Sequence, residues 1–121
     1  MVLLVLDCAN FRMHFLFPEF GIDEIYLHKS EIIKKAKITG KEFDILLLRL
    51  LKYIRLIPLE ILIPYREEAD KIMGKIDKED TVFISTALAF NCPIWSDDKH
   101  FKKQKIIKII TTKDMIKFYK K

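Results

Sequence analysis

The chain has 121 residues, of which 50% are hydrophobic and 32% are charged, and its formal net charge is +5. This length and composition fit one domain, residues 1–121, which can bury a core without disulfides or structural metals. Two cysteines and three glycines exclude a disulfide framework, a zinc site made of cysteine pairs and a glycine-rich phosphate loop.

Apolar runs and capping residues predict the secondary structure in chain order. We predict strands over residues 2–6 and 12–17, which end at Asp7 and Pro18, and a helix from Pro18 to about residue 38. The later predicted elements are a helix after the capping box Thr39–Glu42, a strand over 54–57, a helix over 66–73, an apolar helix over 82–90, strands over 92–96 and 106–110, and a final helix capped by Thr111 or Thr112.

Strands alternate with helices along the chain, which is typical of a parallel sheet covered on both faces. The strands are continuously apolar, as expected when both faces are buried. We therefore predict an α/β domain with three layers (α/β/α) and a mainly parallel sheet. Ligands of such sheets bind beyond the carboxyl ends of the strands, so the residues after each strand are candidates for a functional site.

Acidic residues gather at these positions. They are Asp7 after the first strand, Asp97 and Asp98 after the strand over 92–96, Asp77, Glu79 and Asp80 before the apolar helix, and Asp23 and Glu24 near the start of the first helix. Carboxylates that converge at one sheet edge repel each other unless a cation neutralises them, and oxygen ligands suit Mg²⁺ or Mn²⁺. The alternative to metal binding is that these acids have structural roles. They could cap helices, form turns or form helical ion pairs, such as Glu24 with His28.

Other sites have weaker support in the sequence. The three histidines, His14, His28 and His100, share no spacing that is typical of a metal site. Positive charge is concentrated at the C-terminus, where residues 99–121 contain nine lysines and a single acid, Asp114. This asymmetry suggests a polyanionic partner, and a solvated lysine-rich surface is the alternative. No apolar run is long enough to span a membrane, so we expect a cytoplasmic protein without a membrane partner.

Several segments resemble the PIN-domain family. Asp80-Thr-Val-Phe-Ile-Ser-Thr-Ala87, Asn91-Cys-Pro-Ile-Trp-Ser96 and Asp98-Lys-His-Phe101 are similar to its C-terminal half: an acid that opens an apolar helix, a short strand, then T/S-x-D-x-x-F. Residues 17–25, Phe-Pro-Glu-Phe-Gly-Ile-Asp-Glu-Ile, resemble its second strand and helix. The resemblance covers about residues 12–116. It implies a metal-dependent ribonuclease, in many cases the toxin half of a toxin–antitoxin pair.

The resemblance also implies roles for individual residues. Asp80, Asp98 and Glu24 match the acids that bind Mg²⁺ or Mn²⁺, Asp77 fits a variant with two acids before the helix, and Ser96 matches a small hydroxyl residue that supports the site. We expect RNA and an antitoxin protein as partners, and a homodimer if a missing element leaves surface exposed. Single-stranded RNA is the expected target, with its backbone held by lysines that follow Asp98: Lys99, Lys102, Lys103 and Lys105.

The N-terminus departs from the family pattern. Residues 3–10 resemble the family's opening strand and D-x-N, but too few residues follow for a helix before the next strand. In one interpretation Asp7 is the first metal-binding acid. In the other, residues 1–11 are the end of a helix and its loop, and the first strand is absent. The site would then lack one ligand, and the chain would be a non-cleaving PIN-fold module that binds RNA or protein.

Overall fold

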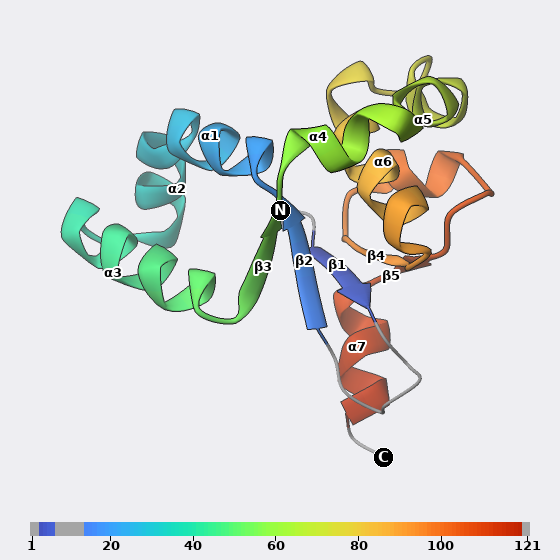
Figure 1. Ribbon diagram of the computed structural model, residues 1–121. Coiled ribbons are helices and arrows are strands. Elements are labelled where there is room, and N and C mark those ends of the chain that lie inside the picture. Colours follow the sequence, from blue (N-terminus) through green and yellow to red (C-terminus); the bar gives the residue numbers. More distant parts are fainter. Residues whose placement is uncertain (1–2, 7–13, 120–121) are drawn as a thin grey trace.

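The computed structural model of the chain describes residues 3–6 and 14–119, and the side chains of residues 15–117 (Figure 1). In this part of the chain the strands are β1 (Leu3–Leu6), β2 (His14–Pro18), β3 (Ile54–Ile57), β4 (Ile94–Trp95) and β5 (Ile109–Ile110). The helices are α1 (Phe20–Leu27), α2 (Lys29–Ala36), α3 (Gly40–Leu51), α4 (Leu59–Leu62), α5 (Arg66–Met73), α6 (Thr81–Phe90) and α7 (Thr112–Tyr119), with the 3₁₀ helices η1 (Ile63–Tyr65), η2 (Lys78–Asp80) and η3 (Lys99–Lys103). None of these helices is long and apolar enough to cross a membrane.

The strands form one sheet in the order β3-β2-β1-β4-β5. β2 pairs with β3 and β4 pairs with β5 in parallel, whereas β1 is antiparallel to both of its neighbours. Figure 1 shows α1, α2 and α3 on one side of the strands and α4, α5 and α6 on the other. The predicted α/β fold with a mainly parallel, PIN-like sheet is therefore confirmed.

The direction of β1 is the exception to the parallel arrangement. Its last residue, Leu6, pairs with His14, the first residue of β2. A parallel connection between neighbouring strands needs about a dozen residues or more, usually including a helix. Only residues 7–13 separate β1 from β2, so the connection is too short for a parallel pair, and the strands run in opposite directions.

The prediction of one helix from Pro18 to about residue 38 was wrong. Pro18 is the last residue of β2, and the helical region is divided at His28, whose backbone leaves helical geometry (φ −100°, ψ 12°). The two halves pack on different partners, because α1 contacts β2 whereas α2 contacts α3. A straight helix could not follow both surfaces.

Gly21 brings α1 close to the sheet. A Cβ atom at this position would lie 2.6 Å from Cε2 of Phe17, the buried aromatic residue of β2. The glycine weakens the first helical turn, but the absence of a side chain allows this close packing. The start of α1 is thereby held next to the carboxyl end of β2.

The central helix α6 covers the sheet and forms most of the core with it. It contacts β1, β2 and β4 and packs against α5 on its outer side. Phe83, Ile84 and Ala87 of α6 are buried, as are Leu16 of β2 and Ile94 of β4. The apolar character of residues 82–90 follows from this position, since the helix is enclosed on several sides.

The strand predicted over residues 106–110 is shorter than expected. The side-chain oxygen of Gln104 accepts hydrogen bonds from the backbone N–H groups of Ile106 and Ile107, at 3.0 and 2.8 Å. These bonds hold the backbone in a bend, so that pairing begins only at Ile109. The buried Gln104 also donates to the carbonyl oxygen of Phe101 at 2.9 Å and thereby fixes the end of η3.

Candidate metal centre

Two of the predicted acids lie on the short segment that leads into α6. Asp77 precedes η2, and its Oδ1 accepts a hydrogen bond from the backbone N–H of Glu79 at 3.0 Å. Asp80 follows within one turn and occupies the position before α6. The tight turn of η2 therefore places the two carboxylates close together.

The segment after β4 supplies Asp98. Ser96 is buried, and its Oγ accepts a hydrogen bond from the backbone N–H of Asp98 at 3.0 Å. The Asp98 carboxylate in turn accepts from the backbone N–H of His100 at 2.9 Å and begins η3. The backbone on both sides of Asp98 is thus fixed by hydrogen bonds.

Asp97, the neighbour of Asp98, has a different and structural role. Its carboxylate accepts hydrogen bonds from the backbone N–H of Thr112, at 2.8 Å, and from the hydroxyl group of Thr112. These bonds hold the pKa of Asp97 below its ordinary value. Trp95 Nε1 also donates to the Thr112 hydroxyl at 3.1 Å. Asp97 therefore ties the start of α7 to the end of β4.

Glu24, Asp80 and Asp98 come from three separate segments and line one groove of about 580 Å³. The remaining walls are mainly apolar side chains of α1, α2 and α3. The sequence also allowed an ion pair between Glu24 and His28. In the structure His28 pairs with Glu31 instead, with 3.5 Å between Nδ1 and Oε2. The structure therefore brings these three predicted site residues together.

The acids of this cluster disfavour one another's charged forms. Burial raises the pKa of Asp80 to about 7, and the charges of Asp77, Asp98 and Glu24 contribute to the increase. Burial also raises the pKa of Glu24, and the charges of Glu79 and Asp77 add to this effect. A divalent cation bound among these carboxylates would remove the repulsion, and oxygen donors are the ligands that Mg²⁺ and Mn²⁺ prefer.

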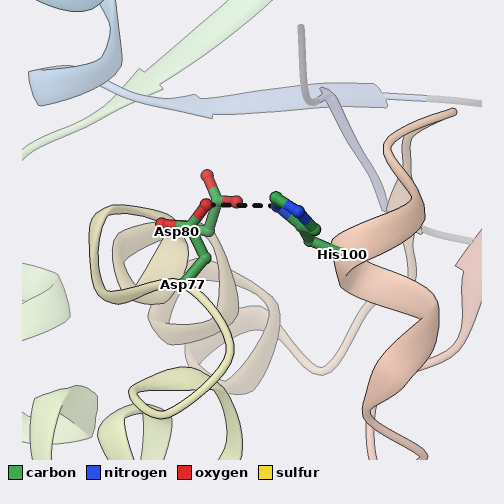
Figure 2. A group of neighbouring side chains, drawn as sticks. All are labelled: Asp77, Asp80 and His100. Atoms are coloured by element: carbon green, nitrogen blue, oxygen red, sulfur yellow. Dashed lines mark ion pairs between the residues drawn. The ribbon is translucent and has the colours of Figure 1, made fainter.

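His100 joins the cluster from the opposite side, as Figure 2 shows. Its Nδ1 lies 3.3 Å from Oδ2 of Asp77 and 3.7 Å from Oδ1 of Asp98. One potential ligand atom each from Asp77, Asp80 and His100 lies within 4.8 Å of the other two. His100 was not predicted as a site residue, because the three histidines share no spacing that is typical of a metal site. Its position two residues after Asp98 was the available signal.

The remaining predicted site residues lie elsewhere. Asp7 lies outside the described residues, and β1 before it ends at the start of β2, whereas the acids lie beyond the carboxyl ends of β2 and β4. The four lysines predicted to bind RNA are exposed on η3 and just after it: Lys99, Lys102, Lys103 and Lys105. Asp7 as a ligand and these lysines as an RNA contact both stay predictions.

The sequence model of one family, described as PIN domain, matches residues 4–120. The chain belongs to the PIN-domain family. Members of this family are in general nucleases that use divalent metal ions, and the cluster of carboxylates and one imidazole is a donor set that fits such an ion. Neither the curated proteins nor the solved structures include a match to this chain.

Proposed function

We propose that this PIN domain is a metal-dependent ribonuclease that cleaves single-stranded RNA. The observation that carries the proposal is the convergence of Glu24, Asp80 and Asp98 on one groove. Burial, with the charges of the neighbouring acids, raises the pKa of Asp80 to about 7, so its ionised form lowers the stability of the metal-free protein. Strongly perturbed carboxylates in a groove are typical of functional sites.

The residues of the cluster have distinct roles in this proposal. Glu24, Asp80 and Asp98, with Asp77, would hold Mg²⁺ or Mn²⁺. Such an ion, when bound, supplies positive charge for the scissile phosphate and orients a water molecule. Ser96 fixes the backbone of Asp98 through its hydrogen bond of 3.0 Å, so that the carboxylate is positioned before the substrate arrives.

The surroundings of the acids favour single-stranded RNA as the substrate. Apolar groove walls accept unstacked bases, which a duplex does not offer. The exposed lysines after Asp98 attract phosphates electrostatically. In the cell, such a ribonuclease would act as the toxin half of a toxin–antitoxin pair, and its protein partner would be the antitoxin.

A cleavage assay with the purified chain tests this proposal. Fluorescently labelled single-stranded RNA should be cut with millimolar Mn²⁺ or Mg²⁺ and should stay intact with EDTA. Asp98→Asn should lose activity, whereas Glu60→Gln, which removes an exposed acid on α4, should retain it. The same sequence in a duplex should be cut more slowly. Full cleavage in EDTA, or by Asp98→Asn, would contradict the proposal.

A non-cleaving module that binds RNA or protein is the second candidate. The direction of β1 favours it, because this strand ends at the sheet edge opposite to the acidic cluster. The second candidate predicts RNA binding without cleavage at any metal concentration. It also predicts that Asp7→Asn leaves stability and RNA affinity unchanged. If Asp7 is instead the first metal-binding acid, Asp7→Asn should abolish cleavage as fully as Asp80→Asn does.

A further inference from the structure

We propose that His100 is a nitrogen ligand of this metal centre, together with Asp77 and Asp80, and that it makes the centre prefer Co²⁺, Ni²⁺ and Zn²⁺ to Mg²⁺. The inference rests on the proposed metal-dependent function and adds the identity of the metal and a ligand to it. It concerns a residue that a purely carboxylate site would not need.

The distances between the potential ligand atoms are close to those expected when three side chains bind one cation. Two ligand atoms bound to one ion at about 2.1 Å are at most about 4.2 Å apart. The potential ligand atoms of Asp77, Asp80 and His100 lie within 4.8 Å of one another, and His100 Nδ1 is 3.3 Å from Asp77 Oδ2. Side-chain rotations that move these atoms by less than about 1 Å would therefore bring all three to one ion.

The contact between His100 and Asp77 contributes little as a simple ion pair. The His100 side chain is 48% exposed and that of Asp77 is 28% exposed. Ion pairs between exposed side chains stabilise a protein by at most about 1 kcal/mol. The two residues also come from separate segments of the chain, Asp77 just before η2 and His100 on η3. A cation bound by both side chains would stabilise this arrangement more than the ion pair alone.

The backbone supports the position of the imidazole. The N–H of His100 donates to the Asp98 carboxylate at 2.9 Å, so both residues are held by the same turn at the start of η3. Phe101, the next residue, is fully buried and anchors this turn in the core. One short segment therefore presents an oxygen donor and a nitrogen donor to the acidic cluster.

The donor type determines the metal preference. Carboxylates and water suit Mg²⁺, whereas imidazole suits Fe²⁺, Ni²⁺ and Zn²⁺, and Co²⁺ lies between Fe²⁺ and Ni²⁺ in the affinity order of such sites. The loss of an imidazole ligand should therefore weaken the binding of Co²⁺ much more than that of Mg²⁺. A carboxylate in its place should support Mg²⁺ but should not restore the preference for Co²⁺.

Calorimetric titration of the full chain with Co²⁺ and with Mg²⁺ tests the inference without measuring cleavage. We expect the wild type to bind Co²⁺ more tightly than Mg²⁺. His100→Asn should reduce the Co²⁺ affinity at least about tenfold and the Mg²⁺ affinity less than about twofold. The visible spectrum of bound Co²⁺ should change in the same variant, because an imidazole nitrogen is lost from the ion. Glu60→Gln should match the wild type in both measurements.

His100→Asp is the second variant, since it offers an oxygen atom at the same position. It should bind Mg²⁺ about as well as the wild type and should still lack the preference for Co²⁺. Circular dichroism establishes that both variants are folded. If the ratio of Co²⁺ to Mg²⁺ affinity is the same in the wild type and both variants, His100 is not a ligand and the inference is wrong, although the ribonuclease proposal stands. If the wild type binds no divalent ion, both are wrong.

Discussion

The replacement of Asp80 by asparagine should have opposite effects on the metal-free and the metal-bound protein. Without metal at pH 8, the variant should be more stable than the wild type, because it lacks a charge that burial and three neighbouring acids disfavour. With excess Mn²⁺, the wild type should be the more stable protein, since only its complete carboxylate cluster binds the ion. Few structural mutations would reverse the order in this way.

The magnitude follows from the pKa of Asp80. Its increase from 3.8 to about 7 would correspond to about 4 kcal/mol if the carboxylate were fully shielded from water. Asp80 is only partly buried, so screening by solvent reduces the figure to about 1–2 kcal/mol. The loss of a favourable charge at the start of α6 offsets about 0.5 kcal/mol of this gain. The remaining gain of about 0.5–1.5 kcal/mol should raise the Tm by about 2–6 °C for a domain of this size.

The pH dependence gives a further test of the same variant. A group with a higher pKa in the folded state than in the unfolded state loses its contribution to stability as the pH rises through the folded-state value. The wild type should therefore become less stable between about pH 4 and pH 7, where Asp80 ionises. Asparagine cannot ionise, so the advantage of the variant should be small near pH 4 and complete above pH 7.

Thermal unfolding followed by circular dichroism, in EDTA and in Mn²⁺, is the appropriate assay. At a free Mn²⁺ concentration about 100 times Kd, the wild type should gain about 2.7 kcal/mol, and Asp80→Asn should gain little. Glu60→Gln should respond like the wild type. A variant that is less stable than the wild type in EDTA at pH 8, and that gains as much from Mn²⁺, would refute the argument.

Two further predictions concern packing and RNA binding. Gly21→Ala should destabilise the protein by about 1–2 kcal/mol in denaturant titrations, because the clash of its Cβ with Phe17 outweighs the roughly 1 kcal/mol gain in helix propensity; an equally stable variant would contradict the packing. RNA affinity should fall steeply with salt concentration. When three exposed lysines after Asp98 are changed to glutamine, the slope of log affinity against log salt concentration should become smaller by about three. The same change at three lysines on other helices should leave that slope unaltered. The first set is Lys102, Lys103 and Lys105, and the control set is Lys34, Lys41 and Lys71.

Several elements could be predicted from residues that lie close to them in the sequence. The capping box is present as predicted: Thr39 Oγ1 accepts from the N–H of Glu42, and Glu42 Oε1 accepts from the N–H of Thr39, both at 3.1 Å. The strand Ile54–Ile57 and the helix Arg66–Met73 have the predicted bounds. In each case the decisive residues lie within a few positions of the element that they determine.

Features that depend on distant contacts could not be predicted in the same way. The division of the first helical region at His28 depends on the different surfaces that α1 and α2 contact. The approach of His100 to Asp77 depends on how η3 packs beside η2, which are separated by α6 and β4 in the chain. By contrast, Glu24, Asp80 and Asp98 follow parallel strands or precede a central helix, and the topology of an α/β sheet brings such positions together.

The most direct test of the proposed site is the rate of RNA cleavage in a double variant. Asp80→Asn, Asp98→Asn and the combined variant should be compared with the wild type on single-stranded RNA in Mn²⁺, under single-turnover conditions. If both carboxylates serve one metal centre, either substitution disables the whole centre, and the double variant should be no slower than the slower single variant. Rate losses that multiply in the double variant, or single variants as fast as the wild type, would contradict a shared metal centre.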